Sequence, residues 1–380
     1  MVLLLVGWCS NALRQARSAG DVLVVGVHSD KEIIEAKGTP PVIPEDERYM
    51  SVEACKFVDE VIKDAPYVPS VEWIDTLINK YKIDYIVHGD DPCYTMDGRD
   101  AYAYAKEKGI FKIIKRTEGV STTDIVGRML LMTRDHHLRG QDSIPMTASA
   151  SMESDDETHF QSTLRVLEND KSKSSKFLPT ARRIRQFSNG KAPSKEDTVV
   201  YICGSWDLFN TGHIQALEKA RSFGTFLIAG IHSDEVSNRL RGKGHPILNL
   251  HERTLSVLSC QYVDEVIMDA PWKIGHDMLQ SMNISVVARG TVCDYEALAR
   301  SEDGVILESE SEIKALIEDS YSVPKELGIL KEFPSPSTIT VTDVIDRVLR
   351  QREIYEKRCA KKKIQEEHYY GKEKQFVAEK

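Results

Sequence analysis

A glycine and a histidine open a helical segment in the second half of the chain. The apolar run VVYICGSWD is followed by LFNTGHIQALEKARS, in which Gly212 and His213 stand where the helix begins. Free N–H groups at a helix start attract phosphate, and a glycine lets the backbone approach it closely. The imidazole would add a hydrogen-bond donor or a positive charge, so the pair predicts a phosphate site. The alternative is that His213 is a surface residue or a cap of the helix.

A second phosphate-type pattern, KRTEGVSTTDIVGR, lies in the first half. Arg116 follows a predicted strand, Gly119 allows a tight turn, and the hydroxyls of Ser121 and Thr122 stand at a predicted helix start. A guanidinium, hydroxyls and free N–H groups together are what a triphosphate requires. The alternative is an ordinary capped helix with a solvated arginine. The counterpart in the second half, PSPSTITVTDVIDR, keeps the hydroxyls but has Pro336 where a cation would be useful.

Charged residues are also expected at the carboxyl ends of strands, where parallel sheets bind ligands. Lys37, in AKGTPP, would neutralise phosphate from a loop above the sheet, and Arg241 is its counterpart. Asp90 and Asp91 end another strand, where carboxylates would receive a cationic acceptor or a metal. The alternatives are a solvated loop lysine for Lys37 and a turn stabilised by the aspartate side chains.

These residues lie in two copies of one pattern. The run ALRQARSAGDVLVVGVHSD matches ALEKARSFGTFLIAGIHSD, and VDEVIKDAP matches VDEVIMDAP. Further on, IDYIVHG matches ISVVARG and TDIVGRML matches TDVIDRVL, in the same order. A repeat of this length indicates a duplicated domain and not a solenoid. His28 and His232 occupy equivalent strand ends, where each either lines a nucleotide pocket or bonds a neighbouring loop.

Strands alternate with helices within each copy. In the first copy, the strand-like runs are MVLLLVG, DVLVVGVHSD, VDEVI, IDYIVHG and FKIIKR. Between and after them come the helical runs NALRQARSAG, EDERYMSVEACKF, SVEWIDTLINKYK and STTDIVGRMLLMTR. Apolar strands joined by helices form parallel sheets. We therefore predict an α/β fold with two tandem Rossmann-like domains built on parallel sheets.

Composition sets the predicted boundaries. The domains are placed at residues 1–133 and 196–350. Residues 134–195 are rich in Ser, Thr, Lys and Asp, which indicates a largely disordered linker with a helix near 160–168. Residues 351–380 form a charged, helix-prone tail, which is either a solvated helix or a contact for a partner or a membrane.

Charge and cysteine content exclude several classes of protein. The 380 residues include 50 Lys and Arg against 59 Asp and Glu, a net charge of −9, which argues against a nucleic-acid coat or a polybasic membrane binder. No apolar run approaches the roughly 18 residues of a spanning helix, and MVLLLVG lacks the basic start of a signal peptide. We therefore expect a cytoplasmic protein. Its seven cysteines form no CxxC pair, which predicts reduced thiols and no structural zinc.

The segments NALRQAR, VDEVI, HGDD, RTEGVSTTD and NLHER together resemble the cytidylyltransferase family, and in particular its members with two tandem halves. The resemblance covers about residues 11–132 and 197–350. It implies nucleotidylyltransferase domains that transfer a cytidylyl group from CTP, accompanied by Mg²⁺, to phosphoethanolamine. The products would be CDP-ethanolamine and pyrophosphate, in the route to phosphatidylethanolamine. Catalysis would rest on positioning and electrostatic stabilisation, without a covalent intermediate.

We expect the following roles for individual residues. His213 and Lys37 are the predicted catalytic residues, and Asp90 and Asp91 would bind the acceptor. Nucleotide and phosphate binding is assigned to Asn210, Gly212, Arg116, Ser121, Thr122, Thr123 and Arg241. No metal site built by the protein alone is predicted, because Mg²⁺ would arrive with CTP.

Both halves depart from the family pattern. The family's HxGH motif, expected directly before NALRQAR, is replaced by Val6, Gly7, Trp8 and Cys9, as in a copy shortened at its N-terminus. In the second half the motif reads NTGH, with Asn210 for the first histidine. One hypothesis is an enzyme of this type, and the other is a catalytically silent nucleotide-binding or regulatory homologue or a truncated isoform. A weaker alternative is a related transferase acting on glycerol 3-phosphate. A homodimer, and contact with the cytosolic face of an organelle membrane, are further options.

Overall fold

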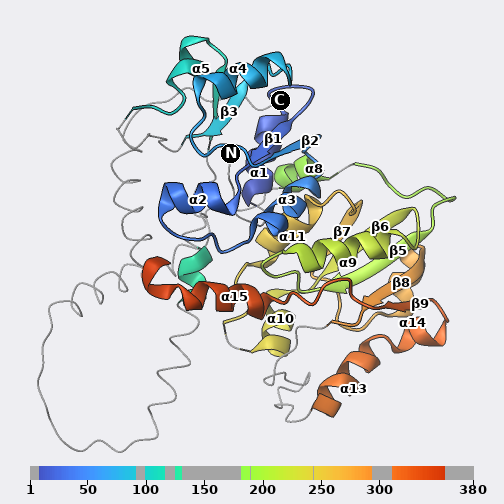
Figure 1. Cartoon of the computed structure of the whole chain (residues 1–380). Coiled ribbons are helices and arrows are strands. Elements are labelled where there is room, and N and C mark those ends of the chain that lie inside the picture. Colours follow the sequence, from blue (N-terminus) through green and yellow to red (C-terminus); the bar gives the residue numbers. More distant parts are fainter. Residues whose placement is uncertain are drawn as a thin grey trace, which may run out of the picture.

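A computed structural model describes residues 8–90, 99–115, 125–130, 181–188, 190–242, 244–292 and 310–355. The described residues form two α/β halves, each with strands that pair in parallel (Figure 1). The predicted fold class is confirmed.

The second half is built on a five-stranded parallel sheet. Its strands β5 (Val199–Gly204), β6 (Phe226–Ile231), β7 (Glu265–Met268), β8 (Ile284–Gly290) and β9 (Leu330–Phe333) take the order β7-β6-β5-β8-β9. The apolar residues of β5 and β6 are buried almost throughout, as expected for central strands of a parallel sheet. The chain continues to β6 on one side of β5 and later to β8 on the other. Ligands bind beside the carboxyl ends of strands at such a reversal of strand order.

Seven helices accompany this sheet among the described residues: α9 (Thr211–Arg221), α10 (Asp234–Arg241), α11 (Leu250–Leu258), α12 (His276–Ser281), α13 (Glu310–Ser320), α14 (Ser322–Glu326) and α15 (Val341–Arg350). Four of them begin at a side chain that accepts a hydrogen bond from a first-turn N–H group: Asn210 for α9, Ser233 for α10, Asn249 for α11 and Thr340 for α15. These polar residues therefore set where the helices begin.

The first half contains the same kinds of elements. Its strands are β1 (Val24–Val27), β2 (Glu60–Lys63), β3 (Ile86–Gly89) and β4 (Phe111–Ile114), and its helices are α1 (Trp8–Arg17), α2 (Asp30–Lys37), α3 (Glu45–Glu53), α4 (Val71–Asn79) and α5 (Ala103–Glu107). Residues 125–130 add a further helical segment within the predicted run STTDIVGRMLLMTR. The helices α2 and α5 were not predicted.

The two sheets differ at their centre. In the first half β1 pairs with β2 and β3 with β4, and no strand among the described residues lies between β1 and β3. In the second half β5 occupies this place and pairs with both β6 and β8. A cavity of about 470 Å³ lies between the two pairs of the first half, lined by residues of both, including Val25 and Ile86. The predicted first strand, MVLLLVG, lies outside the described residues.

A hydrophobic core with side chains from both halves joins them. Val42, Ile43, Ile125, Val126, Met129 and Leu130 of the first half pack with Leu208, Ile247, Leu248, Leu255, Leu258, Val341, Val344, Ile345 and Val348 of the second. Helices α3, α11 and α8 (Ala181–Phe187) lie where the halves meet (Figure 1). Because removing this apolar surface from water requires both halves, each half stabilises the other.

Residues near two of the predicted boundaries pack against the domains. Residues 181–188, placed in the linker, form α8 and a turn, and the side chain of Phe187 is fully buried in the shared core. Tyr355, placed in the tail, is also buried there, and its hydroxyl donates to the carbonyl of Pro40 at 3.3 Å. Only a few apolar side chains make these contacts. The average composition of each segment is polar, so composition alone does not predict that these side chains are buried.

Equivalent residues of the two halves face each other at the junction. Cys55 lies opposite Cys260 in an antiparallel bridge. The N–H of Lys56 donates to the carbonyl of Ser259 at 2.9 Å, and the N–H of Gln261 donates to that of Ala54 at 2.8 Å. Residues 54, 55 and 56 each precede their counterparts 259, 260 and 261 by 205 positions, an offset found in the sequence repeat. The halves therefore pack around a pseudo-twofold axis, like two subunits of a symmetric dimer.

Candidate functional site

The loop between β5 and α9 is held by a buried carboxylate. The side chain of Asp207 is fully buried and accepts hydrogen bonds from the N–H groups of Leu208 and Leu248, both at 3.0 Å, and of Ile247 at 2.7 Å. Burial alone would raise the pKa of Asp207, but the His245 ring 3.7 Å away and the hydrogen bonds from the N–H groups of Leu248 and Ile247 outweigh it and lower the pKa. Asp207 therefore stays ionised and ties the loop before α9 to the loop before α11.

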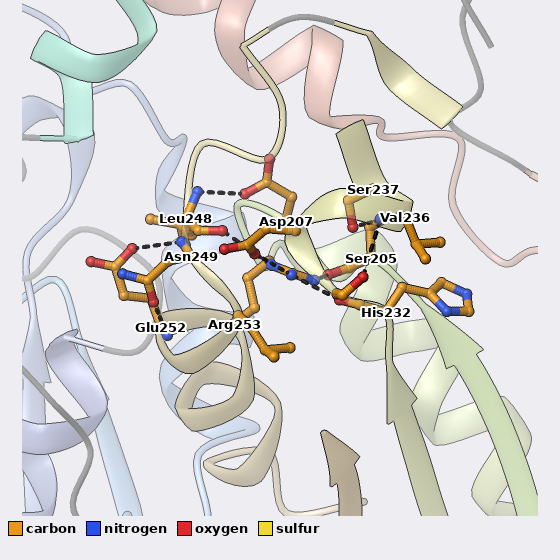
Figure 2. A network of polar contacts seen from close by, with 12 residues as sticks. Ser205, Asp207, His232, Val236, Ser237, Leu248, Asn249, Glu252 and Arg253 are labelled. Carbon is orange, nitrogen blue, oxygen red and sulfur yellow. Dashed lines mark hydrogen bonds and ion pairs between the residues drawn. The ribbon is translucent and has the colours of Figure 1, made fainter. Parts of the chain in front are cut away.

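A buried arginine holds the same two loops. Arg253 has no exposed side-chain surface, and its guanidinium donates to the carbonyls of Leu248 at 3.0 Å, His232 at 2.8 Å and Ser205. It also pairs with Asp234 at 2.7 Å. Figure 2 shows this network, with the guanidinium reaching the segments that carry Ser205, His232 and Leu248. Five hydrogen-bond donors on a rigid plane suit such a junction of backbone carbonyls.

The ring of His213 is a neutral hydrogen-bond donor. Its Nδ1 accepts a hydrogen bond from the backbone N–H of Asn210 at 3.2 Å. A backbone N–H can only donate, so Nδ1 carries no proton and the proton of the neutral ring lies on Nε2. Burial, followed by the charge of Arg241, lowers the pKa of His213 to about 4. The ring also stacks on Phe209, with centroids 5.6 Å apart. Of the two contributions considered for this imidazole, a hydrogen-bond donor or a positive charge, these contacts and the lowered pKa favour the donor near neutral pH.

Asn210 and Gly212 shape the start of α9. The side-chain oxygen of Asn210 accepts from the N–H groups of Gly212 at 2.9 Å and His213 at 3.3 Å, and Asn210 is only 2% exposed. These bonds cap α9 and satisfy the buried amide, and a phosphate contact of Asn210 stays a prediction. A Cβ at Gly212 would lie 2.8 Å from the carbonyl oxygen of Ile339, so the segment around Ser337 passes close over this helix start.

Two further polar residues surround this helix start. Thr211 is 3% exposed, and its hydroxyl has no hydrogen-bond partner among the described residues. Arg241 is buried at the last position of α10, and its charge lowers the pKa of both His213 and Asp207. The first turn of α9 thus carries a hydroxyl and a neutral imidazole, and the guanidinium of Arg241 lies close enough to His213 to act on its charge. Hydroxyl and guanidinium donors with an N–H donor are suited to a phosphate group.

Known proteins match this chain along most of its length. The family described as cytidylyltransferase-like matches residues 10–128 and 201–346. Ethanolamine-phosphate cytidylyltransferase from Arabidopsis thaliana is 48% identical over 98% of this chain and 83% of the relative. Proteins of the same name from Dictyostelium discoideum and Mus musculus are 44% and 39% identical, each over 94% of this chain and over 91% and 86% of their own lengths. The chain belongs to the ethanolamine-phosphate cytidylyltransferase family.

The residues predicted from the family motifs divide between the halves. The structure brings Asn210, Gly212, His213 and Arg241 together in the second half. Lys37 and Asp90 lie in the first half, where Asp90 is buried directly after β3. The other predicted residues of this half, Asp91, Arg116, Ser121, Thr122 and Thr123, lie outside the described residues.

The structure corrects the predicted position of Lys37. It is the last residue of α2, which Gly38 ends in the left-handed conformation with φ 70°, and so does not lie on a loop. Its Nζ lies 5.4 Å from the centre of the Tyr67 ring. Arg241 likewise ends α10 before Gly242, so both cations stand where the helix dipole favours positive charge.

One residue that shapes this site in the ethanolamine-phosphate cytidylyltransferase family member was not predicted. Asp207 is absent from the predicted site residues, although it stands in the same SWDLFNTGH segment as His213. Only its burial and its backbone partners reveal its role.

Along the described stretches of the chain, no helix combines the length and apolar character needed to cross a membrane.

His28 and His232 make equivalent hydrogen bonds to backbone carbonyls. Nδ1 of His28 lies 2.7 Å from the carbonyl oxygen of Ala65, and Nδ1 of His232 lies 3.3 Å from that of Ala270. A carbonyl can only accept, so each Nδ1 carries the proton of a neutral ring. Of the two roles considered for these histidines, the bond to a neighbouring loop is present in both halves.

Three neutral histidines make the stability of this family member sensitive to mild acid. Burial is the main cause that lowers the pKa of His28 to about 3 and of His213 and His232 to about 4, from an ordinary value of 6.5. Between these values the unfolded chain binds more protons than the folded one. These histidines are therefore expected to make their whole contribution to the free energy of unfolding above pH 6.5. This contribution should fall as the pH drops toward 4 and should not fall further below the folded pKa values.

The thermal midpoint measured between pH 4.5 and 7.5 tests this expectation. His232→Asn keeps a donor for the carbonyl of Ala270 but does not titrate, so its midpoint should depend less steeply on pH than that of the wild type. An unchanged slope would contradict a neutral His232.

Proposed function

We propose that this chain transfers the cytidylyl group of CTP to phosphoethanolamine, with release of pyrophosphate. Support comes above all from relatives named ethanolamine-phosphate cytidylyltransferase, of which one is 48% identical over 98% of this chain. The match includes both halves and the segment between them. No relative reported above favours the alternative of a silent homologue.

The arrangement around His213 fits the charge that such a transfer must stabilise. An oxygen of the phosphoethanolamine phosphate forms a bond with the α-phosphorus of CTP, and the bond from this phosphorus to the β-phosphate oxygen breaks, so that pyrophosphate leaves. In our proposal Nε2–H of His213 donates to a phosphate oxygen of the nucleotide, and Arg241 offsets its negative charge. Since Nδ1 of His213 accepts from a backbone N–H, the ring acts as a fixed donor and does not take up a proton.

We assign Mg²⁺ to the substrate and not to a protein site in this half. The carboxylate of Asp207, which interacts electrostatically with His213, already accepts three backbone N–H groups. Among the described residues, no group of three or more His, Cys, Asp or Glu side chains is arranged to hold a metal ion. The phosphate oxygens of CTP would then supply the ligands, as is usual for Mg²⁺ in phosphoryl transfer.

The reaction itself is the direct test. Purified full-length chain is incubated with CTP, Mg²⁺ and phosphoethanolamine, and CDP-ethanolamine is quantified by chromatography. We expect product with phosphoethanolamine, far less with phosphocholine, and none after chelation of Mg²⁺ with EDTA. Binding of CTP, measured by calorimetry, without any product would overturn the proposal in favour of the silent homologue.

The cellular setting proposed here follows from the same chemistry. We propose that the chain works in the cytoplasm, on the cytosolic side of the membranes that use its product for phosphatidylethanolamine synthesis. Homodimerisation and direct contact with a membrane remain predictions.

A further inference from the structure

Two ion pairs cross the junction between the halves at equivalent residues. The guanidinium of Arg128 donates to both carboxylate oxygens of Glu252, at 2.8 and 3.1 Å. That of Arg347 donates to both oxygens of Glu47, at 3.0 and 2.8 Å. The two glutamates are 205 positions apart, and the two arginines hold the same place in TDIVGRML and TDVIDRVL. The pseudo-twofold axis therefore relates the two pairs.

Each arginine lies on the helix that follows a hydroxyl-rich segment of its own half. Arg128 lies in helical residues 125–130, after RTEGVSTTD, and Arg347 lies on α15, after PSPSTIT. Both arginines thus join the helix behind a candidate nucleotide segment to the opposite half. A bidentate pair of this kind fixes orientation as well as distance.

The pair in which Arg128 takes part continues toward His213. The carboxylate of Glu252 is fully buried and also accepts from the N–H of Asn249 at 2.9 Å, which closes the cap of α11. Arg128 donates in addition to the carbonyl of Ile247 at 3.3 Å. The N–H of this same residue donates to Asp207, six positions before His213. An unbroken run of polar contacts therefore joins the first half to the loop that carries the imidazole.

Within the part of the chain that the structure describes, the pair in which Arg347 takes part has no such continuation. The sequence repeat aligns Asp207 with Leu3, at an offset of 204 positions, and a leucine side chain cannot accept hydrogen bonds from backbone N–H groups. At the position equivalent to Asp207, the sequence of the first half therefore has no carboxylate that could clamp the loop before α3. The two pairs are alike in geometry and differ in what lies beyond them.

We propose that Arg128 is a positioning residue for the site of the second half, acting through Glu252, Ile247 and Asp207 on the loop that carries His213. The first half, whose own HxGH motif is missing, would thereby support the site of the second. The identity of the ligand, a nucleoside triphosphate, rests on the proposed function. The coupling between Arg128 and the loop that carries His213 does not require a ligand. Networks of this kind carry coupling when each contact restricts the next.

A fluorine signal beside His213 measures this coupling. The ring of Trp206 lies 5.5 Å from the ring of His213, so 5-fluorotryptophan at this position reports on the loop. The chain has four tryptophans, and loss of one ¹⁹F resonance in Trp206→Phe assigns the signal. In ligand-free protein, we expect Arg128→Ala and Glu252→Gln to shift this resonance, and the double variant to shift it no further than one of them does.

Titration with CTP provides the second measurement. We expect the CTP concentration that half-saturates the change in the Trp206 signal to rise on the order of tenfold in Arg128→Ala. Arg128→Lys should fall between this variant and the wild type, because an ammonium group cannot hold both carboxylate oxygens at once. Arg347→Ala is the matched control. It should lower the thermal midpoint about as much as Arg128→Ala but leave the resonance and the CTP affinity close to wild type.

Equal effects of Arg128→Ala and Arg347→Ala on the Trp206 signal and on CTP affinity would overturn the inference, since both pairs would then only hold the halves together. Failure of the proposed function has a different result. A wild-type resonance that does not respond to saturating CTP would argue against a nucleotide site at His213, while the ligand-free comparison of the variants would still decide whether Arg128 positions the loop.

Discussion

His213→Ala is expected to lower the rate of CDP-ethanolamine formation about 10²–10³-fold, as the loss of one fixed donor does in other enzymes that stabilise developing charge. The contacts of the imidazole fix its orientation for the role proposed above, because Nδ1 accepts the N–H of Asn210 and the ring stacks on Phe209. Only Nε2–H is left to face a ligand. The measurement is kcat at saturating CTP and phosphoethanolamine.

His232→Ala is the matched control for this prediction. His232 is also buried and neutral, but its Nδ1 bonds a loop carbonyl and its ring packs near Trp272. The control should lose stability and keep most of its kcat at a temperature where both variants are folded. Unchanged turnover in His213→Ala would place the working site in the first half, which would then act without an HxGH motif, and our mechanism would be wrong.

The pH dependence of turnover separates a neutral donor from a charged one. Since the pKa of His213 is lowered to about 4, its ring is neutral at pH 6 and above. Protonation of Nδ1 at lower pH would break the bond from Asn210. No loss of kcat from this residue is therefore expected between pH 6 and 8, whereas a catalytic imidazolium would lose activity across that range.

Most elements of the fold were predictable because they depend on local patterns, and the short helices α2 and α5 were the exceptions. The run VVYICG is apolar at nearly every position, and it forms β5, a strand flanked on both sides. Serine, threonine and asparagine before amphipathic runs mark helix starts, as Asn249 and Thr340 do. The sequence repeat then doubles every such signal, so that an element recognised in one half supports its counterpart in the other.

The contacts that hold the site were not predictable, because their partners lie far apart in the sequence. Asp207 bonds residues 40 and 41 positions away, and Arg128 reaches a glutamate 124 positions away. The neutral state of His213 depends on burial, which no motif states. The residue type alone also does not show that the side chain of Asn210 caps α9.

Asp207→Asn is expected to lower the free energy of unfolding by about 3 kcal/mol and to reduce turnover strongly. Both carboxylate oxygens accept N–H groups, and an amide must turn its own NH₂ toward at least one of them. An NH₂ group that faces a backbone N–H in the interior leaves both donors without an acceptor, which costs free energy. The loops before α9 and α11 would then separate, because the carboxylate no longer holds them together. Urea unfolding at pH 7 and kcat measured on the same preparation test the two effects together.

The pH at which Asp207→Asn is compared with wild type provides a further check. Because the folded pKa of Asp207 is lowered, its stabilising contribution is present above the unfolded value of about 3.9 and is lost as the pH falls through the folded pKa. The difference in the free energy of unfolding between wild type and Asp207→Asn should therefore be largest at pH 7 and should shrink in strong acid. Asp234→Asn is the matched control, because that carboxylate is 48% exposed and Arg253 keeps its three carbonyl partners. Equal losses in the two variants would mean that Asp207 is an ordinary ion-pair residue and does not clamp the His213 loop.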